Sequence, residues 1–334
     1  MIRFGTVGTG WITDAFISGT LLRQELELTA VCSRDKARGE AFGARYGAPA
    51  VFTDPAAMAE SDLLDAVYIA SPNALHGKQA RLFLEHGKHV ICEKPIAVAP
   101  EELASLQQLA EEKGLVYMEA IMMMHLPARE ALKKAVGQIG RVTTASFDFS
   151  QLSSKYPAYE RGETPNIFNP VCCTGSLMDL GIYCVYPALD LFGEPEEISA
   201  SAGFLRTGAD GWGTAVLRYP DKQVTLTWSK VGQSRLGSQI LGDQGTVTLE
   251  SISCLTGIRR WEKDGTVHVV WGPEEKATLM GWEAHSLARF IGDPAGTRQE
   301  QAEAARMAMA VSRVMAEIRR KAGIHFPGWE AHEK

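Results

Sequence analysis

The chain has 334 residues, of which 45% are hydrophobic and 22% are charged, and its formal net charge is −6 at neutral pH. A chain of this length and composition is typical of a globular protein with two domains. The acidic balance argues against nucleic acid or an anionic membrane as the main partner, because both bind basic surfaces. We expect a cytoplasmic protein, since no apolar run reaches the length of a membrane span and the first strand begins too early for a signal peptide.

The cysteines carry no pattern typical of a metal site or a redox pair. There are six, and none of them forms a C-x-x-C spacing. Cys172 and Cys173 are adjacent, and chain neighbours do not easily reach disulfide geometry. The sequence therefore predicts reduced thiols and no bound metal.

The first strong signal is a glycine turn between a predicted strand and a predicted helix. An apolar strand at 2–7 runs into Gly8 and Gly10, and a helical pattern follows at 11–23. In a dinucleotide-binding βαβ unit the first glycine permits the tight turn, and the second lets a pyrophosphate approach the start of the helix. The alternative is an ordinary turn between a strand and a helix. The residues predicted to hold the cofactor here are Gly8, Thr9, Gly10, Trp11 and Ile12.

The end of the second predicted strand bears on the choice of cofactor. The strand at 26–32 is followed by Ser33 and Arg34, with no acidic residue at its tip. An acidic residue there would hold the ribose 2′-hydroxyl of NAD, whereas a hydroxyl and a guanidinium suit the 2′-phosphate of NADP. We therefore expect Ser33 and Arg34 to bind NADP in preference to NAD. Asp35 follows one position later and leaves NAD as an alternative.

Strands and helices alternate through the first part of the chain. Further strands are predicted at 50–52, 66–70, 88–92 and 116–120. Helices are predicted between them at 35–46, 55–60, 75–86 and 100–113. This alternation with nearly continuous apolar strands predicts an α/β domain with a doubly wound parallel sheet. We place this Rossmann domain at residues 1–123.

Polar residues follow the predicted strand at 66–70. Ligands bind at the carboxyl edge of such sheets, so we expect Ser71, Asn73 and His76 to line the nicotinamide side of the cofactor. For His76, a solvent-facing position at the start of a helix is an equal alternative.

The next strand ends in Glu93-Lys94-Pro95, again at the carboxyl edge. A partly buried lysine has a lowered pKa and exchanges protons, or its charge stabilises a developing alkoxide. We therefore predict that Glu93 and Lys94 contact the cofactor and that Lys94 is catalytic.

The second part of the chain has a different texture. Its alternating apolar and polar residues predict strands at 141–149, 196–206, 212–219, 222–229, 237–242, 245–250, 257–261 and 266–271. Helices are predicted at 174–191, 281–292 and 297–321. This pattern predicts an α+β domain over 124–334 with a large, mostly antiparallel open sheet. Because few helices are available to cover that sheet, we expect a homodimer or homotetramer that buries one of its faces.

Several motifs together resemble the glucose–fructose oxidoreductase, inositol dehydrogenase and rhizopine catabolism (Gfo/Idh/MocA) family. They are VGTGWIT at 7–13, AVCSRD at 30–35, DAVYIASPNALH at 65–76, EKP at 93–95, YMEA at 117–120 and GSLMDLGIYCV at 175–185. The resemblance covers essentially the whole chain. It implies a Rossmann domain, an open-sheet domain, and hydride transfer between NAD(P) and a sugar, polyol or related alcohol.

The resemblance also implies roles for two residues of the predicted helix at 174–191. Asp179 and Tyr183 are four positions apart and share one helix face. Many family members carry His at the second position, whereas this chain has Tyr, like the dihydrodiol dehydrogenase branch. Tyr183 would pass the proton, and Lys94 would stabilise the charge on the substrate oxygen. Asp179 would orient the substrate by a hydrogen bond to one of its hydroxyl groups, or would position Lys94. Without the family, the two residues form an ordinary half-buried helix pair.

These observations predict an NADP-preferring oxidoreductase acting on a polyhydroxylated or cyclic alcohol, such as a dihydrodiol or an aldose. A non-catalytic NAD(P)-binding regulator on the same fold is the alternative from another class. A third hypothesis is a tightly bound cofactor that shuttles hydride between two substrates. Relatives of that kind typically carry an N-terminal arm around the cofactor, and we expect none here, because the first strand begins at residue 2.

Overall fold

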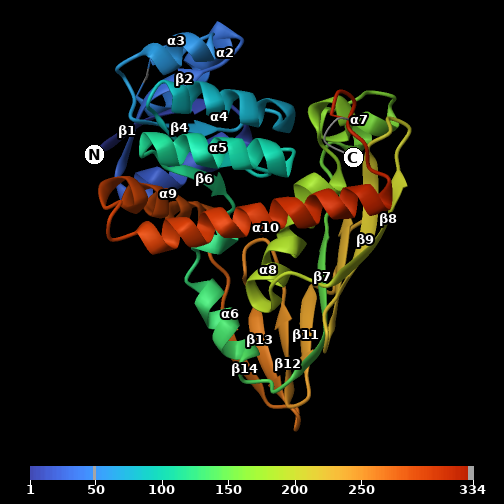
Figure 1. Ribbon diagram of the computed structural model, residues 1–334. Helices are drawn as coiled ribbons and strands as arrows, with labels where there is room; N and C mark the ends of the chain where they lie inside the picture. Colours follow the sequence, from blue (N-terminus) through green and yellow to red (C-terminus); the bar gives the residue numbers. More distant parts are fainter. Residues whose placement is uncertain (48–49, 330–334) are drawn as a thin grey trace. The chain divides into compact units, whose positions relative to one another are not determined.

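The computed structural model describes residues 1–47 and 50–329, which form two compact units (Figure 1). The first unit contains Met1–His125 and Glu275–Met309. The second contains Leu126–Glu274 and the residues from Ala310 onward. The sequence placed all residues after 123 in the second domain, whereas in the structure a late segment returns to the first unit.

The first unit is built on a parallel sheet of six strands in the order β3-β2-β1-β4-β5-β6. This is the doubly wound arrangement expected of a Rossmann domain, and it confirms the predicted fold. The strands are β1 (Ile2–Val7), β2 (Leu26–Cys32), β3 (Ala50–Phe52), β4 (Ala66–Ile69), β5 (His89–Glu93) and β6 (Tyr117–Ala120).

The helices of this unit lie close to their predicted positions, and two of the predicted spans include short 3-10 turns. The stretch predicted as a helix at 35–46 ends in a 3-10 turn at Ala44–Tyr46, and another 3-10 turn at Asn73–Leu75 precedes α4. The helices are α1 (Trp11–Arg23), α2 (Lys36–Gly43), α3 (Pro55–Glu60), α4 (His76–Glu85), α5 (Pro100–Lys113), α9 (Lys276–Gly292) and α10 (Arg298–Ala322), whose residues after Met309 belong to the second unit.

Helix α9 belongs to the first unit because it packs closely against α1. A Cβ atom at Gly19 would lie 2.6 Å from the backbone nitrogen of Gly281, so the two helices meet backbone to backbone at this point. Only a residue without a side chain permits such an approach.

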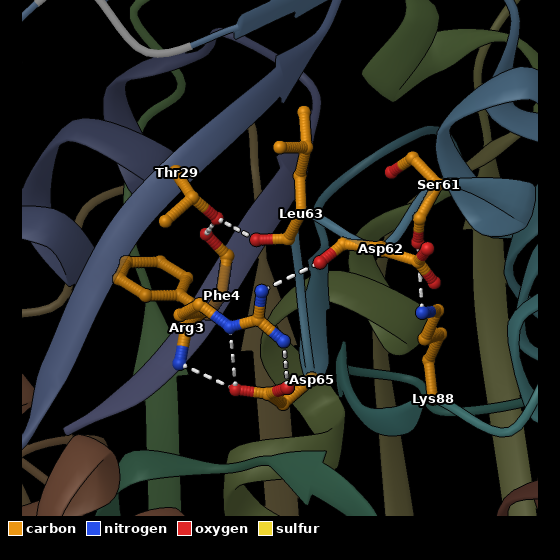
Figure 2. Close-up of polar contacts among 8 residues, drawn as sticks. All are labelled: Arg3, Phe4, Thr29, Ser61, Asp62, Leu63, Asp65 and Lys88. Carbon is orange, nitrogen blue, oxygen red and sulfur yellow. Dashed lines mark hydrogen bonds and ion pairs between the residues drawn. The ribbon is translucent and has the colours of Figure 1, made fainter.

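The amino end of the parallel sheet is held by charged side chains (Figure 2). The Arg3 guanidinium donates to both carboxylate oxygens of Asp65, at 3.2 and 2.5 Å, and to the Asp62 carbonyl. Lys88, just before β5, donates to the Ser61 carbonyl at 2.9 Å. Because the hydrogen bonds of Arg3 favour the charged carboxylate, the pKa of Asp65 is lowered. These contacts lie at the edge of the sheet opposite the predicted cofactor site.

The second unit is built on an eight-stranded sheet in the order β14-β13-β12-β11-β7-β10-β9-β8. Only the β7–β10 pair is parallel among the pairs of this sheet, so the predicted mostly antiparallel sheet is confirmed. The strands are β7 (Val142–Ser150), β8 (Glu197–Phe204), β9 (Asp210–Arg218), β10 (Gln223–Ser229), β11 (Ser238–Gly242), β12 (Gly245–Leu249), β13 (Ile258–Glu262) and β14 (Val267–Trp271).

Two helices of this unit were not predicted. They are α6 (Ala128–Val136) and α7 (Tyr156–Glu160), the second of which is a single short turn that begins near a proline. The predicted helix at 174–191 is in fact a π-helix, Leu177–Gly181, followed by α8 (Ile182–Phe192).

The segment Pro170–Phe192 is long and apolar enough to cross a membrane by length and composition, so the expectation that no run reaches this length is wrong. However, 78% of its apolar window is buried inside the protein, as in a core helix. Gly181 lies against the fully buried Trp228 of β10, where a Cβ atom would be 3.2 Å from the indole ring. The segment is therefore part of the core of the second unit.

Candidate active site

The turn between β1 and α1 has the geometry of a dinucleotide site. Gly8 has a φ of +114°, and a Cβ atom there would lie 2.7 Å from the carbonyl oxygen of Ala70. A Cβ atom at Gly10 would meet no described atom within 4 Å, so the space before the turn is open. No described side chain caps the start of α1, and the first amide groups of a helix have no partner within the helix and suit an anion. The turn therefore fits a pyrophosphate.

The remaining residues of the turn are accessible to a ligand. Trp11 is 74% exposed, and Thr9 and Ile12 are half-buried. The carbonyl oxygen of Thr9 accepts a hydrogen bond from the Arg38 guanidinium at 3.4 Å. Arg38 was not predicted as a site residue, because it lies four positions beyond Arg34 inside a helix and only the fold brings it to the glycine turn.

Of the residues after β2, one caps the next helix and the others are candidates for binding the cofactor. Asp35 is the N-cap of α2, and its carboxylate accepts a hydrogen bond from the Arg38 backbone amide at 3.1 Å. Ser33 is buried, whereas Arg34 is exposed. The acidic side chain that directly follows Ser33 and Arg34 is therefore used by a helix cap, and the side chains of Arg34 and Arg38 are exposed.

His76 lies at the start of α4 and is 1% exposed, so the solvent-facing alternative is wrong. Its Nδ1 lies 2.9 Å from the Pro95 carbonyl oxygen, and its Nε2 lies 2.8 Å from the Ser71 carbonyl oxygen. Burial lowers the pKa of His76, while these two carbonyl oxygens oppose that shift. The ring joins the loop after β4 to the loop after β5. Asn73 lies in the 3-10 turn between Ser71 and His76.

Lys94 directly follows β5 and is preceded by a buried carboxyl group. The Glu93 carboxylate accepts hydrogen bonds from the Tyr68 hydroxyl at 2.5 Å and from the Lys94 backbone amide at 3.3 Å. Burial raises the pKa of Glu93, and the neighbouring Lys94 charge opposes this rise. The Glu119 carboxylate accepts from the Ile96 amide at 2.9 Å. Two carboxyl groups thus fix the backbone on both sides of the cis peptide bond between Lys94 and Pro95.

The structure brings the predicted residues of the first unit to one edge of its sheet. They follow the carboxyl ends of β2, β1, β4 and β5, which are neighbours in that order. Ligands of doubly wound sheets bind at this edge. The residues are Gly8, Thr9, Gly10, Trp11, Ile12, Ser33, Arg34, Ser71, Asn73, His76, Glu93 and Lys94.

Asp179 and Tyr183 lie in the second unit, on the π-helix and the first turn of α8. In the stretch from Cys173 to Leu189 these are the two residues that are not fully buried. The Tyr183 ring packs edge to face on Phe149, with centroids 5.5 Å apart. π-helical turns are often found at functional sites, and this one leaves two polar side chains accessible on an otherwise apolar segment.

The start of the π-helix is anchored by the buried Asp210. Its carboxylate accepts from the Ser176 hydroxyl at 2.6 Å and from the Leu177 amide at 2.7 Å. A Cβ atom at Gly175 would lie 1.9 Å from the same carboxylate. Burial raises the pKa of Asp210, and these donors oppose the rise. Sequence reasoning missed both Asp210 and Lys230, which forms an ion pair with Asp179, because each is far from the helix in the chain.

All six cysteines are free thiols. Among residues 1–47 and 50–329, no group of three His, Cys, Asp or Glu side chains is arranged to hold a metal ion.

Comparisons with known proteins match both units. Residues 2–121 match an oxidoreductase family with an NAD-binding Rossmann fold, GFO/IDH/MocA, and residues 127–248 match the GFO/IDH/MocA C-terminal domain. The chain is 38% identical over 331 residues to scyllo-inositol 2-dehydrogenase (NADP(+)) IolU of Bacillus subtilis, covering 99% of this chain and 100% of the relative. It is 30% identical over 255 residues to trans-1,2-dihydrobenzene-1,2-diol dehydrogenase of Macaca fuscata fuscata, covering 74% of each chain.

A solved structure is also similar. KijD10, a 3-ketoreductase from Actinomadura kijaniata, superposes with a TM-score of 0.80 at 22% identity, covering 96% of this chain and 97% of that one. At this identity the likeness supports the fold alone. The two domain matches and the full-length similarity to IolU confirm what the motifs predicted: the chain belongs to the Gfo/Idh/MocA family of oxidoreductases.

Proposed function

We propose that this protein is an NADP-dependent dehydrogenase that moves a hydride between the nicotinamide and a carbinol carbon of a cyclic polyol or diol. The observation that carries the proposal is the sheet edge of the first unit, where a glycine turn open to a pyrophosphate and Lys94 follow the ends of β1 and β5. The bound nicotinamide would accept or supply the hydride. The non-catalytic regulator has no support among the relatives, whose names are those of enzymes.

The residues after β2 support NADP. The exposed Arg34 and the buried Ser33 follow the strand, and Arg38 reaches the Thr9 carbonyl of the glycine turn. Two guanidinium groups and a hydroxyl are suited to a phosphate monoester. Asp35, the residue that would favour NAD, accepts a hydrogen bond from the α2 backbone instead. The relative at 38% identity is named as an NADP(+) enzyme.

The names of two relatives, an inositol dehydrogenase and a dihydrobenzenediol dehydrogenase, support the proposed substrate class. Both names describe six-membered rings with hydroxyl groups on neighbouring carbons. We propose that Lys94 stabilises negative charge on the reacting oxygen, that Tyr183 exchanges its proton, and that Asp179 accepts a hydrogen bond from a neighbouring hydroxyl.

The test is the reduction of NADP⁺, followed at 340 nm, with a panel of inositols, aldoses and trans-cyclohexane-1,2-diol. Lys94→Ala is expected to abolish turnover while NADPH still binds, and Tyr183→Phe to lower kcat by about 10²- to 10⁴-fold, the usual contribution of a general acid or base. Lys88→Ala is the matched control, because Lys88 lies at the amino end of the same strand. Unchanged turnover in Lys94→Ala would refute the assigned role, and NADPH binding without turnover of any substrate would favour a regulator.

We further propose that the protein assembles as a homodimer or homotetramer through the sheet of the second unit. The face opposite α8 carries Trp212, which is 47% exposed, and Trp261, which is 39% exposed. Exposed aromatic residues of this size are typical of protein interfaces. Light scattering after size exclusion is expected to report an oligomer, and Trp212→Arg to weaken it; a monomer at micromolar concentration would contradict the proposal.

A further inference from the structure

Lys230 is a buried lysine that neither the sequence motifs nor the proposed mechanism uses. It directly follows β10 and is 8% exposed. Its ammonium group forms an ion pair with the carboxylate of Asp179. Among the described residues, Asp179 is the carboxylate with which Lys230 pairs. A buried lysine is rare and costly unless it is paired, so this position is occupied for a specific contact.

The backbone on both sides of Lys230 is fixed. Its amide donates to the Gly211 carbonyl oxygen at 2.8 Å, and its own carbonyl oxygen accepts from the Ser153 amide at 2.9 Å. The preceding residue, Ser229, is paired in register with Ser150 of β7 and Trp212 of β9. The ammonium group therefore extends from a rigid strand end, which limits the positions that its partner can adopt.

Asp179 is held from its own side as well. Its amide donates to the Gly175 carbonyl oxygen at 3.2 Å, and Asp210 anchors the same turn through Ser176 and Leu177. The Asp179 side chain is 26% exposed, whereas that of Lys230 is 11% exposed. The carboxylate thus pairs with the buried ammonium group while part of the Asp179 side chain stays exposed.

We propose that Lys230 is a positioning residue of the active site, which holds the Asp179 carboxylate ionised and oriented to accept a hydrogen bond from a substrate hydroxyl group. The inference rests on the proposed function, in which Asp179 receives the substrate. Lys230 acts through Asp179 and needs no contact with the reacting atoms. Its charge favours the ionised form of the carboxylate, and its fixed position selects one orientation.

The other ionisable groups around this turn are few. The elements packed against the π-helix carry the following ionisable residues: Asp148 on β7, Asp210 and Arg218 on β9, and Tyr183, Cys184, Tyr186 and Asp190 on α8. Of these, Asp210 is already engaged by two donors, and burial raises the pKa of the Cys184 thiol. Lys230 is the cation of the second sheet that forms an ion pair with Asp179.

The experiment compares Lys230→Met, Lys230→Arg and Asp179→Asn with the double variant, using kcat, KM and the pH dependence of kcat/KM. Without the ammonium group the pKa of Asp179 rises, so the acid limb of kcat/KM is expected to move up by about one pH unit or more in Lys230→Met. The loss of orientation is expected to lower kcat/KM by about 10- to 100-fold. Lys230→Arg, which keeps the charge, is expected to restore the position of the acid limb.

Lys222→Met is the matched control, since Lys222 lies before the other end of β10 and pairs with the exposed Asp221. It is expected to leave the pH profile unchanged. If Lys230 acts through Asp179, then Asp179→Asn and the double variant lose the same factor in kcat/KM. An acid limb that stays in place in Lys230→Met, or losses that multiply in the double variant, would overturn the proposal and leave a purely structural ion pair.

A second readout needs no turnover and separates this inference from the proposed function. The Asp179 carboxyl carbon can be titrated by NMR in protein labelled with ¹³C-aspartate, with its signal identified by its loss in Asp179→Asn. A higher Asp179 pKa in Lys230→Met supports the charge-setting role of Lys230, even if no substrate of the panel is turned over and the proposed function fails. An unchanged pKa overturns that role, even if the enzyme is active.

Discussion

Glu283 offers a sharp test of how burial acts in the first unit. Its side chain lies in α9 and is 1% exposed, and neither carboxyl oxygen has a hydrogen-bond partner among the described residues. Burial raises the pKa of Glu283 well above its usual value of 4.5, the carboxyl groups of Glu93 and Glu119 raise it further, and Lys276 opposes the rise. We therefore expect the Glu283 carboxyl group to keep its proton to a higher pH than an exposed glutamate does.

A raised pKa in the folded state gives a definite dependence of stability on pH. Below pH 4.5 the folded and unfolded chains both carry the proton, and the stabilising contribution is fully present. As the pH rises toward the folded pKa, the unfolded chain loses the proton first. The free energy of unfolding then falls by up to about 1.4 kcal/mol per pH unit. Between pH 5 and pH 7 this amounts to at most about 2.7 kcal/mol.

The variants Glu283→Gln and Glu283→Met both remove this titration. The melting temperature of wild type minus that of either variant is therefore expected to fall as the pH rises from 5 to 7. For a chain of this size the fall is up to roughly 5 °C. Glu283→Met also removes an unsatisfied polar group and is expected to be the more stable of the two at pH 7. Differential scanning calorimetry across pH 5 to 8 measures the difference, with the exposed Glu275→Gln at the start of the same helix as a control. Parallel curves for wild type and Glu283→Gln would refute the reasoning.

Three further outcomes are expected. Arg38→Ala should weaken NADPH binding by about 10- to 100-fold through the loss of a charge-assisted contact and leave NADH binding unchanged. Equal losses of affinity for NADPH and NADH in fluorescence titrations would show that Arg38 does not contact the 2′-phosphate. The lowered pKa of Asp65, due first to its hydrogen bond from Arg3, adds stability that is present above pH 3.8 and is lost as the pH falls through the folded pKa. Asp65→Asn should therefore flatten the decline of melting temperature below pH 5, and an unchanged decline would contradict this. His76→Ala should lower the melting temperature and kcat together, because the ring joins the loops after β4 and β5; an effect on NADPH affinity alone would instead indicate a direct cofactor ligand.

The sequence predicted the features that depend on neighbours in the chain. The glycine turn at Gly8, the alternating strands of the first unit, and the polar strand end at Lys94 each have a local signature. The short helix α7 was missed because a single turn with a proline has no helical periodicity to detect. The π-helix around Asp179 was predicted as an α-helix, since the apolar pattern does not distinguish the two.

The parts of the candidate site that sequence reasoning missed are contacts between distant segments. Lys230 reaches Asp179 from the end of β10, and the Arg38 guanidinium reaches Thr9 of the glycine turn from α2. The same holds for α9, which returns to the first unit because Gly19 and Gly281 permit close packing. A single sequence has no pattern that shows which distant residues will be in contact, because the tertiary fold brings them together.

Transfer of deuterium from the cofactor to the substrate tests the central claim most directly. Purified protein would be incubated with NADPH deuterated at C4, in separate samples for the two faces, and with the ketone of a cyclic polyol. We expect one of the two samples to yield an alcohol with deuterium on the new carbinol carbon, detected by mass spectrometry, and Lys94→Ala to yield none. Tight NADPH binding without deuterium transfer from either face would contradict the assignment of this protein as a dehydrogenase of cyclic polyols or diols.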